Sequence, residues 1–160
     1  MQISGGVQLS GGVNLAPGGS GGSAGASDGY TSGGYTGSYT NVIQKFSFSS
    51  DGNSTDVGDL TANRGASAGQ SSSVSGYTSG GLSPFSNVID KFPFANGGNA
   101  SDVGDLINAN YNCSGQYSST SGYASGGRNS DVVNTIQKFS FSSDGNASDI
   151  GDILTARRYT

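Results

Sequence analysis

One segment of about 46 residues occurs three times in this 160-residue chain, and the copies are nearly identical. Tyr30, Tyr77 and Tyr123 each begin a Tyr-Thr-Ser-Gly-Gly or Tyr-Ala-Ser-Gly-Gly segment, and each is followed by an Asn-containing apolar segment and an Asp-Val-Gly-Asp or Asp-Ile-Gly-Asp segment. A fixed period of roughly 20 to 50 residues is typical of one supersecondary unit that stacks on copies of itself. The repeat therefore predicts the architecture before any single residue is considered.

Each copy contains four short segments with the character of strands, separated by Gly, Ser, Asn and Asp. In the first copy these are the Tyr30 segment, Val42–Phe48, a segment centred on Val57, and 66–73. Alternation along the second segment predicts that Phe46 and Phe48 face inward. Their counterparts are Phe92 and Phe94 in the second copy, and Phe139 and Phe141 in the third.

The composition favours a folded all-β chain over a disordered one. Glycine is abundant, at 29 residues, but only 11% of residues are charged, and the apolar residues recur in short runs in register. Seven Lys and Arg against eleven acidic residues leave no basic patch for phosphates, so nucleic-acid binding is not expected. A membrane helix needs about 20 apolar residues in succession, and no such run occurs, so membrane insertion is not expected either.

The sequence divides into two parts. Residues 1–22 are rich in Gly and Ser, and Ser-Gly-Gly-Val with a following Leu occurs there twice. This pattern predicts a short anchoring arm that becomes ordered on a partner, and the alternative is a disordered tail. Residues 23–160 form the three-repeat domain.

The order of residues within a copy resembles a Kelch-type β-propeller blade. That pattern has a Gly-Gly pair, an apolar strand with an aromatic residue, a large apolar residue and an Arg, matched here by Gly33, Gly34, Phe46, Val57 and Arg64. In the second copy Asn110 takes the place of the Arg, and Val or Ile stands in all copies where the family has Trp. The segments Asn87–Phe94 and Asp102–Leu106 also resemble Kelch-like repeat proteins of marine bacteriophages. The resemblance implies an all-β fold of three four-stranded propeller blades per chain.

The phase of the repeats bears on assembly. Ser23–Ser27 resembles Ser67–Ser71, the fourth strand segment, whereas the chain ends soon after the third segment of the last copy. Because propellers typically have about four to eight blades, three blades predict a homodimer or higher oligomer completed to a ring by strand exchange. The alternatives are a three-sided β-prism or a stacked β-solenoid, for which three repeats suffice.

The Asp- and Asn-rich turns are candidates for a metal site. Calcium prefers six to eight oxygen ligands, and alternating Asp and Asn present them in compact loops. The candidate ligands are Asp51, Asn53, Asp56, Asp144, Asn146 and Asp149. The competing interpretation is that these are β-turns in which Asp side chains accept hydrogen bonds from nearby backbone amides. Beyond this possible calcium, no cofactor is expected.

Candidate ligand-binding residues lie between the first and second strand segments of each copy, where the copies differ most. They are Tyr35, Tyr39, Phe85 and Arg128. Variable loops on a rigid scaffold are common binding positions, and tyrosine rings combine an apolar face with a hydrogen-bonding hydroxyl. Cell-surface glycans are therefore candidate partners, and the alternative is harmless variation at loop tips.

Catalysis has little support in the sequence. Histidine is absent, and the single cysteine, Cys113, occupies the position of Ser67 and is predicted to be a small strand residue. We therefore expect a non-enzymatic structural or adhesive protein of an extracellular assembly, in particular a phage virion component such as a tail fibre, receptor-binding or head-decoration protein. Residues 1–22 would contact other virion proteins. The alternative function is a soluble carbohydrate-binding, lectin-like module, and a glycoside hydrolase comes third.

Overall fold

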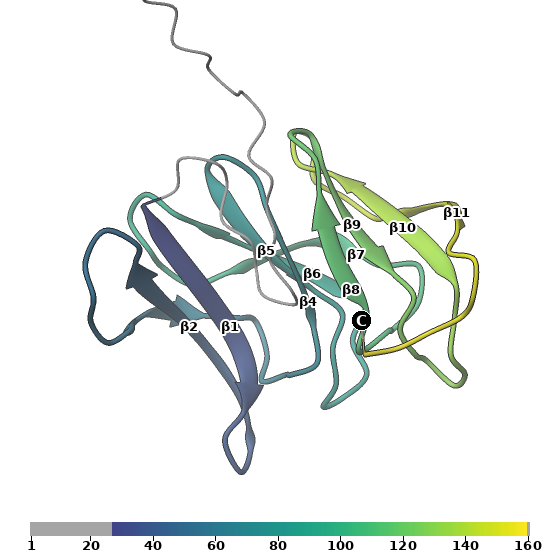
Figure 1. Cartoon of the computed structure of the whole chain (residues 1–160), viewed down its shortest axis with the longest axis horizontal. Coiled ribbons are helices and arrows are strands. Elements are labelled where there is room, and N and C mark those ends of the chain that lie inside the picture. The colour runs from purple at the N-terminus through teal and green to yellow at the C-terminus, as the bar shows by residue number, and fades with distance from the viewer. Residues whose placement is uncertain (1–26, 160) are drawn as a thin grey trace, which may run out of the picture.

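The computed structural model describes residues 27–159, which form eleven β-strands in three antiparallel sheets (Figure 1). No helix occurs in this part of the chain, so none there is long and apolar enough to cross a membrane. The predicted all-β class is confirmed. The arm predicted at residues 1–22, and most of the strand segment at 23–27, lie outside the described residues.

Each sheet is an antiparallel meander with its strands in chain order. Sheet one consists of β1 (Asp28–Tyr35), β2 (Tyr39–Ser47) and β3 (Thr55–Asp59). Sheet two consists of β4 (Ala68–Ser71), β5 (Ser75–Ser79), β6 (Val88–Pro93) and β7 (Ser101–Asp105). Sheet three consists of β8 (Ser114–Tyr117), β9 (Ser121–Ser125), β10 (Thr135–Ser140) and β11 (Ser148–Asp152).

The pairing of β4 corrects the strand order expected from the sequence. The segment 66–73 was predicted to end the first repeat, yet β4 pairs with β5 and opens sheet two, with Gln70 opposite Tyr77. The reason is a tight hairpin, in which the amide of Ser72 donates to the Ser75 carbonyl and the amide of Ser75 donates to Ser72 Oγ. β8 opens sheet three in the same way. Sheets two and three are therefore complete within the chain, without an exchanged strand.

Glycine beside an aromatic ring fixes the packing inside each sheet. Gly76 lies directly opposite Phe92 on the neighbouring strand, and a Cβ added to it would lie 2.2 Å from the ring. The pairs Gly29–Phe46 and Gly122–Phe139 repeat this arrangement. The Gly-Tyr dipeptide that starts each repeat thus places a ring over the glycine on one face of the sheet and a tyrosine on the other.

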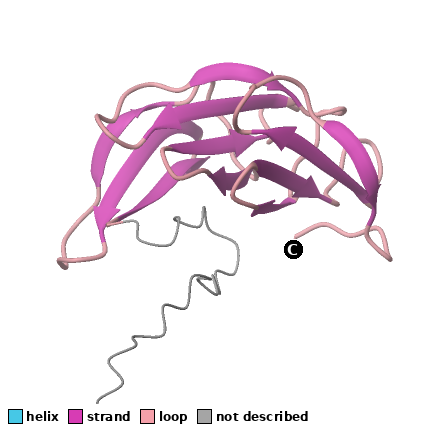
Figure 2. Cartoon of the chain, turned by 90° about the horizontal axis from the view of Figure 1, so that it is seen from above, coloured by secondary structure: helices cyan, strands magenta, loops and turns pink. Residues whose placement is uncertain are grey.

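The apolar core lies between the sheets. One cluster joins sheets one and two through Tyr30, Ile43, Leu60 and Phe92. A second joins sheets two and three and includes Ala68, Tyr77, Ile89, Leu106, Cys113, Ala124 and Phe139. The sheets follow one another in an open arc (Figure 2), and β4 and β8 approach so closely that a Cβ on Gly115 would lie 2.3 Å from the Gly69 carbonyl oxygen.

Candidate functional site

The same aromatic contact joins the sheets at both internal junctions. Tyr30 stacks on Phe94 with ring centroids 4.7 Å apart, and Tyr77 stacks on Phe141 at the same separation. Each tyrosine also touches the preceding phenylalanine of the next sheet, at 5.7 Å for Phe92 and 5.6 Å for Phe139. Each sheet therefore has a Tyr face and a Phe face, and at both junctions the Tyr face of one sheet meets the Phe face of the next.

Backbone hydrogen bonds along the last strand of each sheet reinforce the junctions. At the first, the amides of Gly98 and Ala100 donate to the carbonyls of Val57 and Asp59, at 2.6 and 2.7 Å. Asn99 Oδ1 accepts from the Asp59 amide at 3.0 Å. The second junction repeats the set with Gly145 and Ala147 as donors, at 2.7 Å each, and with Asn146 accepting from Asp105 at 3.0 Å. The turn asparagines thus act as connectors between sheets.

The polar pair buried at each junction differs between the two. At the first, the Arg64 guanidinium forms an ion pair with Asp90 at 2.6 Å, and both side chains are almost fully buried. Asp90 also accepts from the Thr61 amide at 2.9 Å. At the second, the equivalent residues are the amides Asn110 and Gln137, both buried, and Gln137 Oε1 accepts from the Ile107 amide at 2.7 Å. Both charges are replaced together, which leaves no unpaired charge in the junction.

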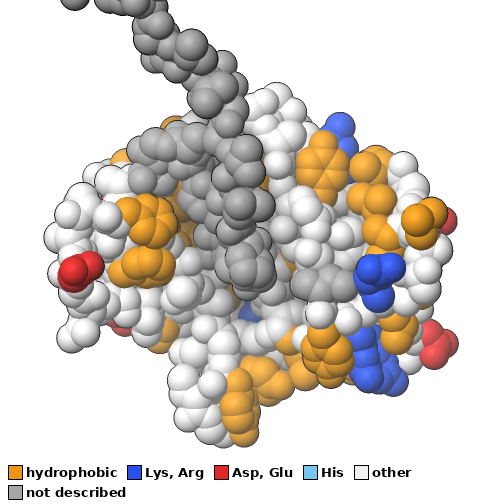
Figure 3. Space-filling model, viewed as in Figure 1, with side chains coloured by type: hydrophobic (Ala, Val, Ile, Leu, Met, Phe, Trp, Pro, Cys, Tyr) orange, Lys and Arg blue, Asp and Glu red, His pale blue; other side chains and the backbone are white. Residues whose placement is uncertain are grey.

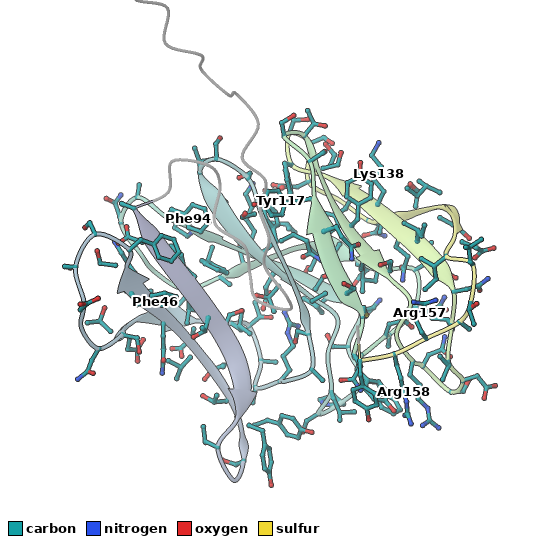
Figure 4. All side chains as sticks on the ribbon, in the orientation of Figure 1. Phe46, Phe94, Tyr117, Lys138, Arg157 and Arg158 are labelled. Carbon is teal, nitrogen blue, oxygen red and sulfur yellow. The ribbon has the colours of Figure 1, made fainter. Side chains whose placement is uncertain are left out.

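The outer faces carry the same residues without a neighbouring sheet. Phe46 and Phe48, predicted to face inward, are 37% and 59% exposed, whereas Phe92 is 2% exposed. At the other end of the arc, Ile150 is 51% exposed and nothing lies within 4 Å of where a Cβ on Gly151 would be. Phe46 lies on sheet one, and Lys138 and Arg157 lie at the opposite end of the arc (Figure 4). The prediction for the first copy was wrong because, among residues 27–159, no sheet covers Phe46 and Phe48.

The predicted ligand-binding residues lie on one end of the sheets, where each first strand of the repeat turns into the second. Tyr35 and Tyr39 contact edge to face at 5.1 Å. Phe85 stacks on Tyr111, with centroids 5.3 Å apart and planes at 6°. Tyr111 in turn exchanges two backbone hydrogen bonds of 2.9 Å with Arg128.

These loops form a continuous strip, which we call the loop rim. Tyr39 lies over Gly65, where an added Cβ would be 3.0 Å from the ring, and Gly65 is hydrogen-bonded to Leu82 in the Phe85 loop. The rim thus links Tyr35, Tyr39, Phe85, Tyr111 and Arg128 across three sheets. Apolar and basic side chains gather along the lower edge of the molecule in Figure 3. Tyr111 could not be found from the variable loops, because it lies between the last strand of one sheet and the first of the next, and only the second copy has a tyrosine there.

The candidate calcium ligands take part in local hydrogen bonds. Asp56 and Asp149 accept from the amides of Gly58 and Gly151, two residues onward, at 3.1 and 2.9 Å. Asp144 pairs with Lys91 at 3.0 Å, and Asn146 connects sheets. Asp51 and Asn53 are exposed. Between residues 27 and 159, no three His, Cys, Asp or Glu side chains form a group that could hold a metal ion. The calcium site stays a prediction.

Cys113 is buried just before β8. Burial raises the pKa of its thiol to about 11, so the side chain is protonated near neutral pH. It packs in the core between sheets two and three, as a small residue beside Gly127, where an added Cβ would lie 3.0 Å from its sulfur.

A scan against models of known protein families finds no match for this chain, and a search of curated proteins finds none either.

Proposed function

We propose that the protein is a non-enzymatic structural and adhesive subunit of an extracellular assembly, such as a bacteriophage particle. The observation that carries this proposal is a contrast within the repeat. The contacts between sheets recur with the same geometry at both junctions, whereas the loop rim has different side chains in every copy. A constant scaffold with variable loops is the arrangement that proteins use for recognition.

The proposal includes β-propeller blades as the building unit. Each complete sheet is a four-stranded antiparallel meander, as propeller blades are. The first strands of sheets two and three lie against each other, and the apolar core fills the space between the sheets. These features support a blade arrangement in which the first strands lie nearest a common axis. They favour it over a prism, whose sheets form the sides of a triangle.

Particle association tests the structural role. Phage particles that encode this chain, purified on a density gradient, are expected to contain it in a fixed number of copies. Deletion of residues 1–22 is expected to remove the chain from particles, because these residues are proposed to contact other virion proteins. A full-length chain that stays in the soluble fraction while particles assemble normally would refute the virion role.

Carbohydrate binding is the second candidate, and the exposed aromatics of the loop rim favour it. Tyr35 and Phe85 are 67% and 56% exposed and lie on the same rim. The double variant Tyr35→Ala, Phe85→Ala is expected to weaken glycan binding at least tenfold, which corresponds to about 1.4 kcal/mol. Val74→Ala is the matched control, because Val74 is equally exposed but lies in the hairpin at the opposite end of sheet two. Equal loss in both variants, or no glycan bound by the parent chain, would exclude this role.

A further inference from the structure

We infer that two copies of this chain join head to tail, with the Tyr face of sheet three in one copy packed on the Phe face of sheet one in the other. Two such junctions close a ring of six sheets. The inference rests on the contacts between sheets within one chain and does not depend on the adhesive role proposed above.

The aromatic residues of the outer faces complement each other. At each internal junction a tyrosine of one sheet lies on two phenylalanines of the next. In the part of the chain that the structure describes, Phe46 and Phe48 contact each other at 5.5 Å but receive no tyrosine, and no phenylalanine lies on Tyr123. Placed as Tyr77 is on Phe139 and Phe141, the Tyr123 ring of one copy covers the two exposed rings of the other.

The backbone edges are equally complementary. The last strand of sheet three offers the carbonyls of Ile150 and Asp152, which correspond to those of Val57 and Asp59 at the first junction. The turn of sheet one offers the amides of Gly52 and Ser54 and the side chain of Asn53, which correspond to Gly98, Ala100 and Asn99.

Gly151 shows why this edge is fitted for a neighbour. Its counterparts Gly58 and Gly104 are each within 2.3 Å, measured from an added Cβ, of the backbone of the next sheet. Gly151 has a φ of 139°, which favours glycine by itself, and an added Cβ there would meet nothing within 4 Å, so this edge has room for a neighbouring backbone. A second copy seated on this edge places a turn backbone against it, as in the two internal junctions.

A charged pair also supports the head-to-tail contact. Lys91 of sheet two pairs with Asp144 of sheet three at 3.0 Å. At the first junction, the second repeat of the chain has Gly97 in place of that aspartate. Lys45 of sheet one pairs instead with Asp28 of its own sheet, at 3.1 Å. The outer faces keep both members, because Lys138 corresponds to Lys91 and Asp51 corresponds to Asp144, and both are exposed. Head-to-tail contact brings these two charges together.

The number of copies follows from the number of sheets. Propellers close with about four to eight blades. Residues 27–159 of each chain supply three sheets. Two copies give six such sheets, which lies within that range, whereas one copy gives three and three copies give nine. A head-to-tail contact forms a closed ring and not a filament when its rotation returns to the first copy, which in this inference happens after two copies.

Native mass in solution is the first test. Full-length protein is expected to have twice the chain mass of 15.9 kDa in sedimentation or native mass spectrometry. Tyr123→Arg is expected to shift the protein to the mass of one chain, with its far-UV circular dichroism unchanged because Tyr123 lies on an outer face. A parent protein with the mass of a single chain at tens of micromolar, or a Tyr123→Arg protein that keeps the dimer mass, would overturn the inference.

Cross-linking determines the orientation. Two proteins, Asp51→Cys and Lys138→Cys, both carry Cys113→Ser, which copies Ser67 of the first repeat. A short bis-maleimide is expected to join the two proteins when mixed, and to leave each uncross-linked when alone. Phe85→Cys in the same background is the control and is expected to give no product with either. Efficient cross-linking of either protein to itself would show a head-to-head contact and overturn the inference. A protein that is monomeric in solution but still associates with particles would refute this inference and leave the proposed function standing.

Discussion

The internal junctions and the outer faces carry the same aromatic residues at the same strand positions, yet these residues differ in exposure. Phe139 is 3% exposed at the second junction, whereas Phe46, at the same position in sheet one, is 37% exposed. The difference lies wholly in the neighbouring sheet, because Phe46 rests on Gly29 as Phe139 rests on Gly122. A phenylalanine at this position is therefore expected to contribute more to stability when a tyrosine of the preceding sheet covers it.

The two internal junctions also differ from each other. The first buries the Arg64–Asp90 ion pair, and the second replaces both residues by amides. A buried charge that loses its partner is costly, whereas a junction that lacks both charges avoids this cost. Between the two junctions, both residues of the pair therefore differ together.

The largest effect is expected from removing a covered phenylalanine. Phe139→Ala is expected to lower the free energy of unfolding by about 3–5 kcal/mol, the usual loss for a buried ring. Phe46→Ala is expected to cost about 1 kcal/mol or less, because its ring keeps much of its contact with water. Urea denaturation measures both, in a Tyr123→Arg background so that self-association does not contribute. Equal losses would contradict the comparison between junction and outer face.

The buried ion pair gives the next largest effect. Asp90→Gln alone and Arg64→Asn alone are each expected to lower the free energy of unfolding by about 3 kcal/mol, because each leaves a buried group without its partner. The double variant copies the Asn110–Gln137 pair and is expected to recover most of that loss. A double-mutant cycle by urea denaturation measures the coupling. Losses that simply add would show that the two junctions do not tolerate exchange of their polar pairs.

The sequence predicted the elements of this fold better than their grouping. The segment Val42–Phe48 overlaps β2 (Tyr39–Ser47) because apolar alternation and Gly-rich turns are local properties. The assignment of β4 to the wrong repeat has a different origin. Which neighbour a strand pairs with depends on the hairpin at Ser72 and on the longer connection that precedes Ala68, and the repeat alone fits both groupings equally well.

The positions of the candidate ligand-binding residues, but not their binding role, could be predicted in part from the sequence. Tyr35, Tyr39, Phe85 and Arg128 were recognised because they vary at one position of the repeat, and the structure places them on one rim. Tyr111 belongs to a different connection and meets Phe85 only through space. The exposure of Phe46 was not predictable from its own segment, since the first and third copies share the sequence Ile-Gln-Lys-Phe-Ser-Phe.

Alanine substitutions at two equivalent glycines distinguish the cost of backbone strain from the cost of a clash with the next sheet. Gly104 and Gly151 have similar backbone angles, with φ of 153° and 139°, so alanine is strained at either position. Only at Gly104 does an added Cβ also meet the next sheet, 2.3 Å from the Gly145 backbone. Gly104→Ala is therefore expected to cost about 1–3 kcal/mol more than Gly151→Ala in thermal or urea unfolding of the single chain. In the dimer, Gly151→Ala is expected to weaken association, because the added Cβ would clash with the turn of sheet one in the second copy. Equal costs in the single chain would show that strain, and not the neighbouring sheet, sets the requirement for glycine.

The smallest expected effect is a gain in dimer affinity. It comes from a substitution that makes the contact between the two copies resemble the first internal junction. Arg157 corresponds to Arg64, but the residue that corresponds to Asp90 in sheet one is Gln44, which is exposed. Gln44→Asp is expected to give Arg157 of the second copy a carboxylate partner, because Asp90 holds Arg64 in that geometry. Desolvation offsets part of the gain, which leaves about 1 kcal/mol, or roughly fivefold tighter association, for each junction. Sedimentation equilibrium measures the dissociation constant, and the control is the same substitution in an Arg157→Asn chain, where the gain is expected to vanish. Tighter association in both backgrounds would mean that Gln44 acts without Arg157, and it would break the correspondence between the outer and internal junctions.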